Sequence, residues 1–363
     1  MRILLLVQRL WRGGGTETHV LTLASGLRQM GHHVTLYTSG GPWVSQARRL
    51  GVPLHIDTVL QRPGRPKVLR LRRFLQAHTF DIVHAHDGPT MTLAALALRG
   101  LVRRPQLVAT VHGPYVGAAA LGATKGIAKA VITVSPALKP KTVSATRLPA
   151  GRVYTIPNGI RTDLFRPGKN KPLRKLHKVP EDAYVIGYAG RFTVEKAALG
   201  RRVVRSLKRF SLAHKRVYVL VVGRESKRIV GTSRGRVKVL GPMGMGKMPD
   251  FYNSCDLVIG TARVAAESAI CGVPTMAVGS AGDHGLVTQK SLRHMIQTNF
   301  GDHGAVRPWT HSQLNTKLSH AMSKQRMLKH EAGQVRKALA DQLSSHRMIR
   351  RILRVYRLAI STK

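Results

Sequence analysis

Residues 2–30 read RILLLVQRLWRGGGTETHVLTLASGLRQM and combine a strand, a turn and a helix. Residues 2–8 form a short apolar run that predicts a β-strand, and residues 16–30 carry apolar side chains at helical spacing. The glycines at 13–15 allow a sharp turn and a close approach to a ligand, while the helix start offers free N–H groups to an anion. This unit is therefore either an anion site or an ordinary tight turn.

The same alternation continues along the first half of the chain. A helix is predicted at 66–78, and further strands at 34–38, 80–86, 106–112, 130–135 and 153–157. Short apolar strands separated by helices predict a parallel sheet that is covered by helices on both faces.

A polar, basic segment, RPGKNKPLRKLHKVP at 166–180, interrupts the pattern and is expected to be a linker. The alternation then restarts, with strands predicted at 184–190, 217–222, 237–240, 256–260 and 274–278, helices at 194–210, 247–255 and 263–271, and mostly helix from 310. The predicted fold class is α/β, with two doubly wound, Rossmann-like domains (1–165 and 181–340) facing a central cleft. A basic amphipathic helix is predicted at 341–363.

The charge balance is strongly positive. Lys and Arg number 60 against 16 Asp and Glu, a formal net charge of +44. Such a field attracts anionic partners: phosphorylated substrates, an anionic membrane surface or nucleic acid. Specific nucleic-acid binding is not expected, because only 5% of residues are aromatic and the chain has no helix-turn-helix or zinc signature.

The C-terminal helix carries part of this charge. Its arginines at 347, 350, 351 and 354 fall on one stripe, opposite an apolar side. Either the helix docks on an anionic membrane, or its apolar side packs on the first domain and the arginines face water.

The chain is expected to be cytoplasmic, with any membrane contact peripheral on the inner leaflet. Its two cysteines, Cys255 and Cys271, exclude a disulfide framework and are predicted to be buried thiols. The apolar run at 3–7 is too short for a signal-peptide core, and none approaches the length of a membrane span.

Histidines stand at two predicted strand ends. His84, His86 and Asp87 end one strand, and His112 ends another. His84 and His86 point to the same side, which would allow a metal pair, but the chain has no carboxylate cluster beside them. The alternative is a polar wall at the edge where open α/β sheets bind ligands, with His112 facing the substrate. No metal site is predicted.

The second half offers two further candidates. Arg191 and Lys196 follow a predicted strand and can clamp a diphosphate from two directions; the alternative is a solvated surface pair. Glu267 lies early in a predicted helix, where its carboxylate can accept hydrogen bonds from both hydroxyls of a ribose. The alternative is an acid that is favoured there by the helix dipole.

Seven segments together resemble glycosyltransferase family 4, retaining enzymes of the GT-B fold, in their bacterial form. They are GGTE (14–17), DIVHAH (81–86), VATVHG (108–113), VITVSPALK (131–139), PNGI (157–160) with LFRP (164–167), YAGRFTVEK (188–196) and AESAICGVP (266–274). The resemblance implies that the second domain binds the nucleotide-sugar donor and the first domain binds the acceptor.

The resemblance also implies roles for single residues. Arg191 and Lys196 would bind the diphosphate, Glu267 would bind the ribose, and His112 would face the transferred sugar. The implied donor-binding set is Gly14, Gly15, Gly190, Arg191, Lys196, Arg263 and Glu267, the implied catalytic set is His112, Arg191 and Lys196, and the acceptor-side set is Glu17, His86 and Asp87.

The function implied is transfer of a sugar, with retention, from a nucleotide-sugar to a lipid-linked or cell-envelope saccharide acceptor, by a hexosyltransferase that needs no metal and no cofactor. One departure motivates an alternative. Many members of the family carry a second Glu eight residues before the ribose acid, and here that position is Ile259. The alternative is a catalytically impaired GT-B protein that binds polyanions or an anionic membrane.

Overall fold

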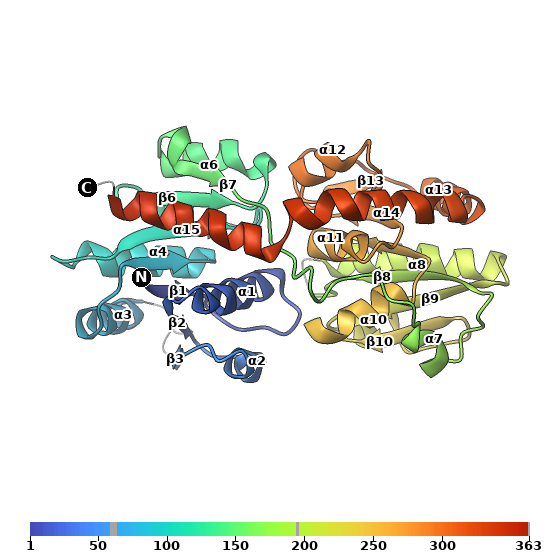
Figure 1. The fold of residues 1–363 in the computed structure, drawn as a ribbon, viewed down its shortest axis with the longest axis horizontal. Coiled ribbons are helices and arrows are strands. Elements are labelled where there is room, and N and C mark those ends of the chain that lie inside the picture. Colours follow the sequence, from blue (N-terminus) through green and yellow to red (C-terminus); the bar gives the residue numbers. More distant parts are fainter. Residues whose placement is uncertain (59–63, 194–195, 362–363) are drawn as a thin grey trace. The chain divides into compact units, whose positions relative to one another are not determined.

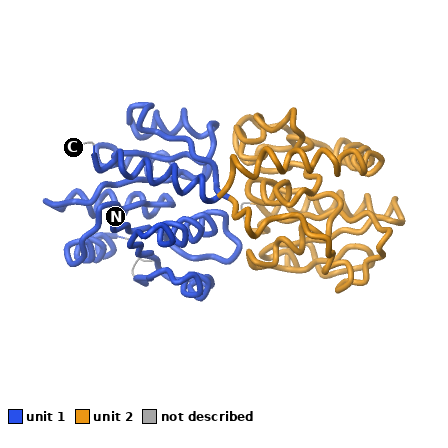
Figure 2. Tube along the Cα trace, viewed as in Figure 1, with its two compact units in different colours: residues 1–159, 345–363 blue, residues 160–344 orange. Residues whose placement is uncertain are grey.

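A computed structural model describes residues 1–58, 64–193 and 196–361. The chain divides into two compact units, residues 1–159 with 345–363 and residues 160–344 (Figure 2). Each unit is a sheet, parallel except for one edge strand of unit 2, with helices on both faces, as the alternation of strands and helices predicts (Figure 1).

The sheet of unit 1 has the strand order β3-β2-β1-β4-β5-β6-β7, and its described pairs are all parallel. Its strands are β1 (Arg2–Leu6), β2 (His33–Thr38), β3 (Leu54–Ile56), β4 (Ile82–Ala85), β5 (Gln106–Val111), β6 (Ala128–Thr133) and β7 (Val153–Thr155). Its α-helices are α1 (Gly15–Gln29), α2 (Val44–Arg49), α3 (Arg65–Ala77), α4 (Gly88–Arg99), α5 (Ala118–Ala123), α6 (Lys139–Thr146) and α15 (Ser345–Ser361).

Side-chain alternation along the strands builds two cores in unit 1. Ile3 and Leu5 of β1 face α1 and α15, whereas Leu4 and Leu6 face α3, α4 and α5. All four are fully buried, because a central parallel strand is covered on both faces. The strands therefore read as continuous apolar runs.

The sheet of unit 2 has the order β10-β9-β8-β11-β12-β13. Its strands are β8 (Tyr184–Ala189), β9 (Val217–Val222), β10 (Val237–Gly241), β11 (Leu257–Gly260), β12 (Thr275–Gly279) and β13 (Gly282–Leu286). Its α-helices are α7 (Pro172–Leu176), α8 (Ala197–Ala213), α9 (Ser226–Val230), α10 (Met248–Asn253), α11 (Arg263–Ile270), α12 (Leu292–Gln297), α13 (His311–Ser323) and α14 (Gln325–Gln342). Residues 194–195, where the helix now seen as α8 was predicted to begin, lie outside the described residues.

The edge strand β13 was not predicted from the sequence. It pairs antiparallel with β12, and its sequence, GDHGL, has neither a run nor an alternation of apolar residues. A glycine at 282 with φ of 94° makes the tight reversal after β12.

The division between the units differs from the predicted boundaries. The chain leaves unit 1 at Gly159 and returns to it at Ser345, so that the predicted linker, 166–180, lies inside unit 2. Within that segment Arg174 is 4% exposed, because its guanidinium donates to the carbonyls of Ser254 and Ala183 and pairs with Asp256. The segment has the basic, polar composition that is typical of a linker, but it is packed within unit 2.

Helix α15 corresponds to the predicted basic helix, of which residues 362–363 are not described. Its apolar side is buried in the core of unit 1, beside α1. Its exposed side carries five arginines, at 347, 350, 351, 354 and 357. Gly159 lies directly against its start, since a Cβ there would be 2.7 Å from the Cα of Ser345.

Both cysteines are buried free thiols, as predicted. Among the helices of the described residues, none combines the length and the apolar composition that a membrane span requires.

Candidate functional site

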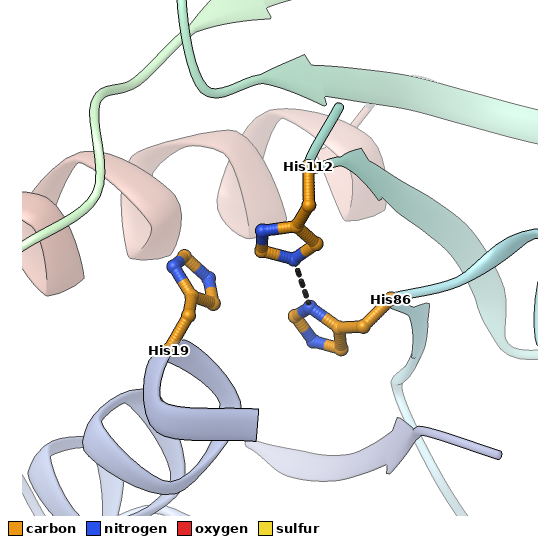
Figure 3. Close-up of side chains that lie close together, drawn as sticks. All are labelled: His19, His86 and His112. Atoms are coloured by element: carbon orange, nitrogen blue, oxygen red, sulfur yellow. Dashed lines mark hydrogen bonds between the residues drawn. The ribbon is translucent and has the colours of Figure 1, made fainter. Parts of the chain in front are cut away.

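In unit 1, buried histidines gather where strands β4 and β5 end. His86 follows β4, His112 follows β5, and His19 reaches them from α1 (Figure 3). All three are less than a tenth exposed, and one ring nitrogen from each lies within 4.8 Å of the other two. The carboxyl edge of a parallel sheet thus brings together residues from three segments of the sequence.

Hydrogen bonds fix the orientation of these rings. His86 Nδ1 lies 3.3 Å from His112 Nε2, and His19 Nδ1 lies 3.0 Å from Asn158 Oδ1. Since the Asn158 amide oxygen accepts, the hydrogen of this bond is carried by Nδ1 of His19. Imidazoles in such a network can hydrogen bond to neutral polar groups such as hydroxyls.

His84 lies behind His86, with ring centroids 4.0 Å apart. It is fully buried, with Nδ1 2.6 Å from the hydroxyl of Tyr356 on α15 and Nε2 2.7 Å from Thr110 Oγ1. Burial lowers the pKa of His84 well below its ordinary value, and burial with the neighbouring His84, His19 and His112 does the same for the pKa of His86. Both imidazoles are therefore neutral at pH 7.

The trio His19, His86 and His112 is also a donor set that could hold a metal ion. Neutral imidazoles suit zinc, and two nitrogen ligands on a tetrahedral zinc stand about 3.3 Å apart. The same lone pairs and N–H groups suit the hydroxyls of a sugar equally well. The arrangement alone is compatible with both.

The glycine turn of unit 1 accommodates an acid. Gly14 precedes α1, and a Cβ there would lie 1.8 Å from Glu17 Oε2. Glycine therefore lets the carboxylate of Glu17, which is 8% exposed, fold back over the turn. Gly13 adopts φ of 73° in the same turn, a conformation that favours glycine.

Asp87 has a structural role that was not predicted from the sequence. Its Oδ1 accepts the N–H of Thr90, forming the N-cap of α4, and its Oδ2 accepts the N–H of Gln8. Burial raises the pKa of Asp87, although these hydrogen bonds oppose the shift. The carboxylate thus joins the ends of β1 and β4, and its predicted contact with an acceptor stays a prediction.

In unit 2, β8 and β11 are parallel neighbours, so the segments that follow them leave the same edge of the sheet. After β8 come Gly190, whose N–H donates to Val222, then the half-buried Arg191 and Lys196. The ammonium of Lys196 is 2.7 Å from Asp302 Oδ1, and both side chains are mostly buried. Asp302 was missed by the sequence analysis.

After β11, helix α11 carries Arg263 and Glu267. Glu267 Oε1 accepts from the guanidinium of Arg263, 2.9 Å away, and its Oε2 accepts from the hydroxyl of Tyr252 at 2.8 Å. Burial raises the pKa of Glu267, and the charge of Arg263 and the hydrogen bond from Tyr252 oppose that shift. These two bonds hold the carboxylate in place. Ile259 is fully buried within β11.

Comparison with known proteins agrees with the sequence. A family model described as Glycosyltransferase Family 4 matches residues 13–164. The N-terminal part of this chain is a glycosyltransferase family 4 domain. The resemblance to this family is thereby confirmed over residues 13–164, which contain four of the seven segments and the PNGI part of a fifth.

Two curated relatives extend further along the chain. It is 24% identical over 286 residues to the phosphatidyl-myo-inositol mannosyltransferase of Mycolicibacterium smegmatis, covering 74% of this chain and 71% of that protein. It is 28% identical over 239 residues to the D-inositol 3-phosphate glycosyltransferase 1 of Catenulispora acidiphila, covering 56% of this chain and 57% of that protein. The chain is thus related to glycosyltransferases.

Solved structures share the fold over nearly the whole chain. The structure of Anabaena Alr3699/HepE in complex with UDP and glucose aligns with a TM-score of 0.76 at 19% identity, covering 98% of each chain. A glycosyltransferase from Rickettsia africae aligns with a TM-score of 0.77 at 18% identity, covering 100% of this chain and 99% of that one. The chain has the GT-B fold, as predicted.

Proposed function

We propose that this chain is a retaining hexosyltransferase, which moves a sugar from a nucleotide-sugar donor to a saccharide or lipid-linked acceptor without a metal ion. The observation that carries the proposal is the edge of the unit 2 sheet, where the half-buried Arg191 and Lys196 follow β8 and Glu267 follows β11. Two cations and a carboxylate at neighbouring strand ends suit a diphosphate joined to a ribose.

The proposed reaction makes one glycosidic bond and breaks another. The acceptor hydroxyl oxygen bonds to the anomeric carbon as the bond from that carbon to the diphosphate oxygen breaks, and the new bond forms on the face that the diphosphate leaves. The acceptor proton passes to the departing diphosphate. Negative charge develops on that leaving group, and cations that are already in place stabilise it.

The neutral histidines of unit 1 support the sugar-binding part of the proposal. His112 contacts His86, whose imidazole is neutral, within a buried network. Neutral imidazoles hydrogen bond to hydroxyls without attracting the diphosphate away from its cations. In this proposal His112 contacts the transferred sugar, and Glu17 and His86 border the acceptor.

The relatives suggest the classes of substrate. Alr3699/HepE was solved with UDP and glucose, and the Mycolicibacterium smegmatis relative is a phosphatidyl-myo-inositol mannosyltransferase. For this chain we propose a UDP- or GDP-hexose as donor and an envelope glycolipid or saccharide as acceptor, reached from the cytoplasmic side of an anionic membrane.

Ile259 favours a second candidate function. It occupies the position of the family's additional donor-sugar acid and is fully buried, so it makes no contact with a sugar. The absence of an acid at position 259, together with the net charge of +44, would suit a protein that has lost transfer activity and binds polyanions or anionic membranes.

One experiment separates the two candidates. UDP-, GDP- and ADP-hexoses are screened by calorimetry, and the donor that binds is then incubated with membrane glycolipid extracts, with and without EDTA. We expect one donor to bind, and NMR to show a product of the donor's anomeric configuration with EDTA present. A protein that binds heparin or anionic vesicles but none of the donors would reject the enzyme in favour of the second candidate.

A further inference from the structure

The ion pair between Lys196 and Asp302 joins two loops that are far apart in the sequence. The Lys196 ammonium is 2.7 Å from Asp302 Oδ1, and the side chains are 19% and 11% exposed. Burial alone would raise the pKa of Asp302, but Lys196, His303 and the side chain of Ser280 together lower it. The acid is therefore ionised at neutral pH.

Lys196 occupies an unfavourable place for a cation. It is the N-cap residue of α8, a helix of 17 residues, and the positive end of a helix dipole disfavours an ammonium. The next helical turn adds Arg201 and Arg202. The carboxylate of Asp302 offsets this repulsion, because an anion at a helix N-terminus is favoured.

The backbone that presents Asp302 is strained. Asn299 and Phe300 have φ of 48° and 53°, which non-glycine residues seldom adopt and which costs about 1 kcal/mol or more for each. The segment is held by the bond from the Phe300 N–H to the Met295 carbonyl at 2.7 Å, and by the bond from Thr261 Oγ1 to the Phe300 carbonyl at 3.0 Å. The turn after β11 thereby fixes the segment that carries Asp302.

We propose that Asp302 is a positioning residue, which holds the Lys196 ammonium at the N-terminus of α8 where a donor diphosphate binds. A lysine has four rotatable bonds, so an unrestrained ammonium would spend much of its time away from the leaving group. The carboxylate restrains it, but also repels the diphosphate. This inference rests on the proposed function, since it assigns Lys196 to the diphosphate.

The two effects of the carboxylate predict opposite changes when its charge is removed. In Asp302→Asn, we expect kcat to fall about 10- to 100-fold, because a displaced ammonium no longer stabilises the leaving group. The same substitution should tighten binding of the free nucleoside diphosphate, about three- to tenfold, because a nearby like charge is lost. Asp302→Glu, which keeps the carboxylate, should recover most of kcat.

The matched control is Asp283→Asn, which breaks another Asp–Lys pair in unit 2, between the buried Asp283 and the more exposed Lys317 at a distance of 2.7 Å. Binding of UDP, GDP and ADP is measured by calorimetry and turnover by donor hydrolysis, in wild type and in each variant. Asp302→Ser removes the same charge and replaces Asp302→Asn if that variant does not fold. The control should change neither kcat nor nucleotide binding.

The outcomes are distinct. Lower kcat with tighter nucleotide binding in Asp302→Asn supports the positioning role. If kcat is unchanged, or if kcat and nucleotide affinity fall together as they would for a purely structural residue, the inference is overturned while the proposed function stands. If wild type binds no nucleoside diphosphate, the proposed function itself fails.

Discussion

The two units use the same architecture to hold opposite chemistries. In unit 1 the residues after β4 and β5 are buried imidazoles that bond to one another, and those with a resolved pKa shift are neutral. In unit 2 charged residues follow two strand ends: Lys196, after β8, pairs with Asp302, and Arg263 pairs with Glu267 after β11. A parallel sheet delivers side chains to its carboxyl edge, and the residue types at that edge decide whether it suits hydroxyls or phosphates.

The largest expected effect removes a cation from unit 2. Lys196→Ala should lower the transfer rate about 10²- to 10³-fold, the usual loss when one preorganised group that stabilises developing charge is deleted. The measurement is kcat with the donor saturating. Arg209→Ala, which removes an exposed cation farther along the same helix, is the control. A loss of similar size in both variants would show that overall charge, rather than the site, is responsible.

The next expected effect tests the histidine cluster of unit 1. His112→Ala should lower kcat about 100-fold, because it removes a polar group proposed to contact the transferred sugar. Binding of the nucleoside diphosphate should remain within about twofold of wild type, since unit 2 is unchanged. Weaker diphosphate binding in His112→Ala would contradict the separation of roles between the units. His33→Gln, at an exposed histidine of unit 1, is the control.

A smaller effect is expected at the carboxylate of unit 2. Glu267→Gln keeps the shape of the side chain but weakens its acceptance of hydrogen bonds from a ribose. Donor KM should rise about tenfold, or about 1.4 kcal/mol, with kcat nearly unchanged. Comparing the ribose and the 2′-deoxyribose forms of the donor gives the decisive measurement. If the variant discriminates between them as strongly as wild type does, Glu267 does not bind the ribose.

The smallest expected effect concerns stability against pH. The lowered pKa values of His84 and His86 mean that, below about pH 6.5, the unfolded chain takes up protons that the folded chain does not. Stability is therefore lost as pH falls below about 6.5, by about 1 kcal/mol per imidazole for each further pH unit. Urea unfolding at pH 7.5 and 5.5 measures the loss.

His84→Gln should reduce that loss of stability, because only one of the two buried imidazoles then remains. The exposed His320→Gln in unit 2 should leave it unchanged. An unaltered loss in His84→Gln would mean that this imidazole is protonated in the folded protein.

Most of the fold could be predicted from the sequence, because parallel strands that are buried on both faces consist of continuous runs of apolar residues. The strands at 34–38 and 217–222 and the helix at 16–30 agree with β2, β9 and α1 to within one residue. Strand β13 could not be predicted, because its sequence, GDHGL, has neither an apolar run nor an apolar–polar alternation. The packing of the segment at 166–180 was not predicted, because the partners of Arg174 are mainly backbone carbonyls. Every residue has such a carbonyl, so the sequence does not show which of them Arg174 binds.

Only part of the candidate site could be predicted from the sequence. His112 directly follows β5, and Lys196 and Glu267 lie in the segments after β8 and β11, so their place could be predicted from the order of elements. Asp302 lies 106 residues from its partner, and only the scarcity of acids in this chain could have drawn attention to it. His19 was not predicted as a site residue, because it lies on helix α1 and not at the end of a strand.

Part of the basic surplus has a structural use. Several arginines donate to carbonyls at helix ends: Arg72 to Leu96 and Ala97 of α4, and Arg236 to Ser211 of α8. A cation at a helix C-terminus is favoured by the dipole and satisfies carbonyls that lack a partner within the helix. In a chain with 16 acids, backbone carbonyls take the role that carboxylates have elsewhere.

Calorimetric titration with a nucleoside diphosphate and the matching monophosphate, for wild type, Lys196→Ala and the exposed Arg201→Ala, tests the central claim most directly. We expect wild type and Arg201→Ala to prefer the diphosphate, and Lys196→Ala to lose at least tenfold of that preference while binding the monophosphate unchanged. Equal preference for the diphosphate in Lys196→Ala and wild type would contradict a diphosphate site at the edge of the unit 2 sheet.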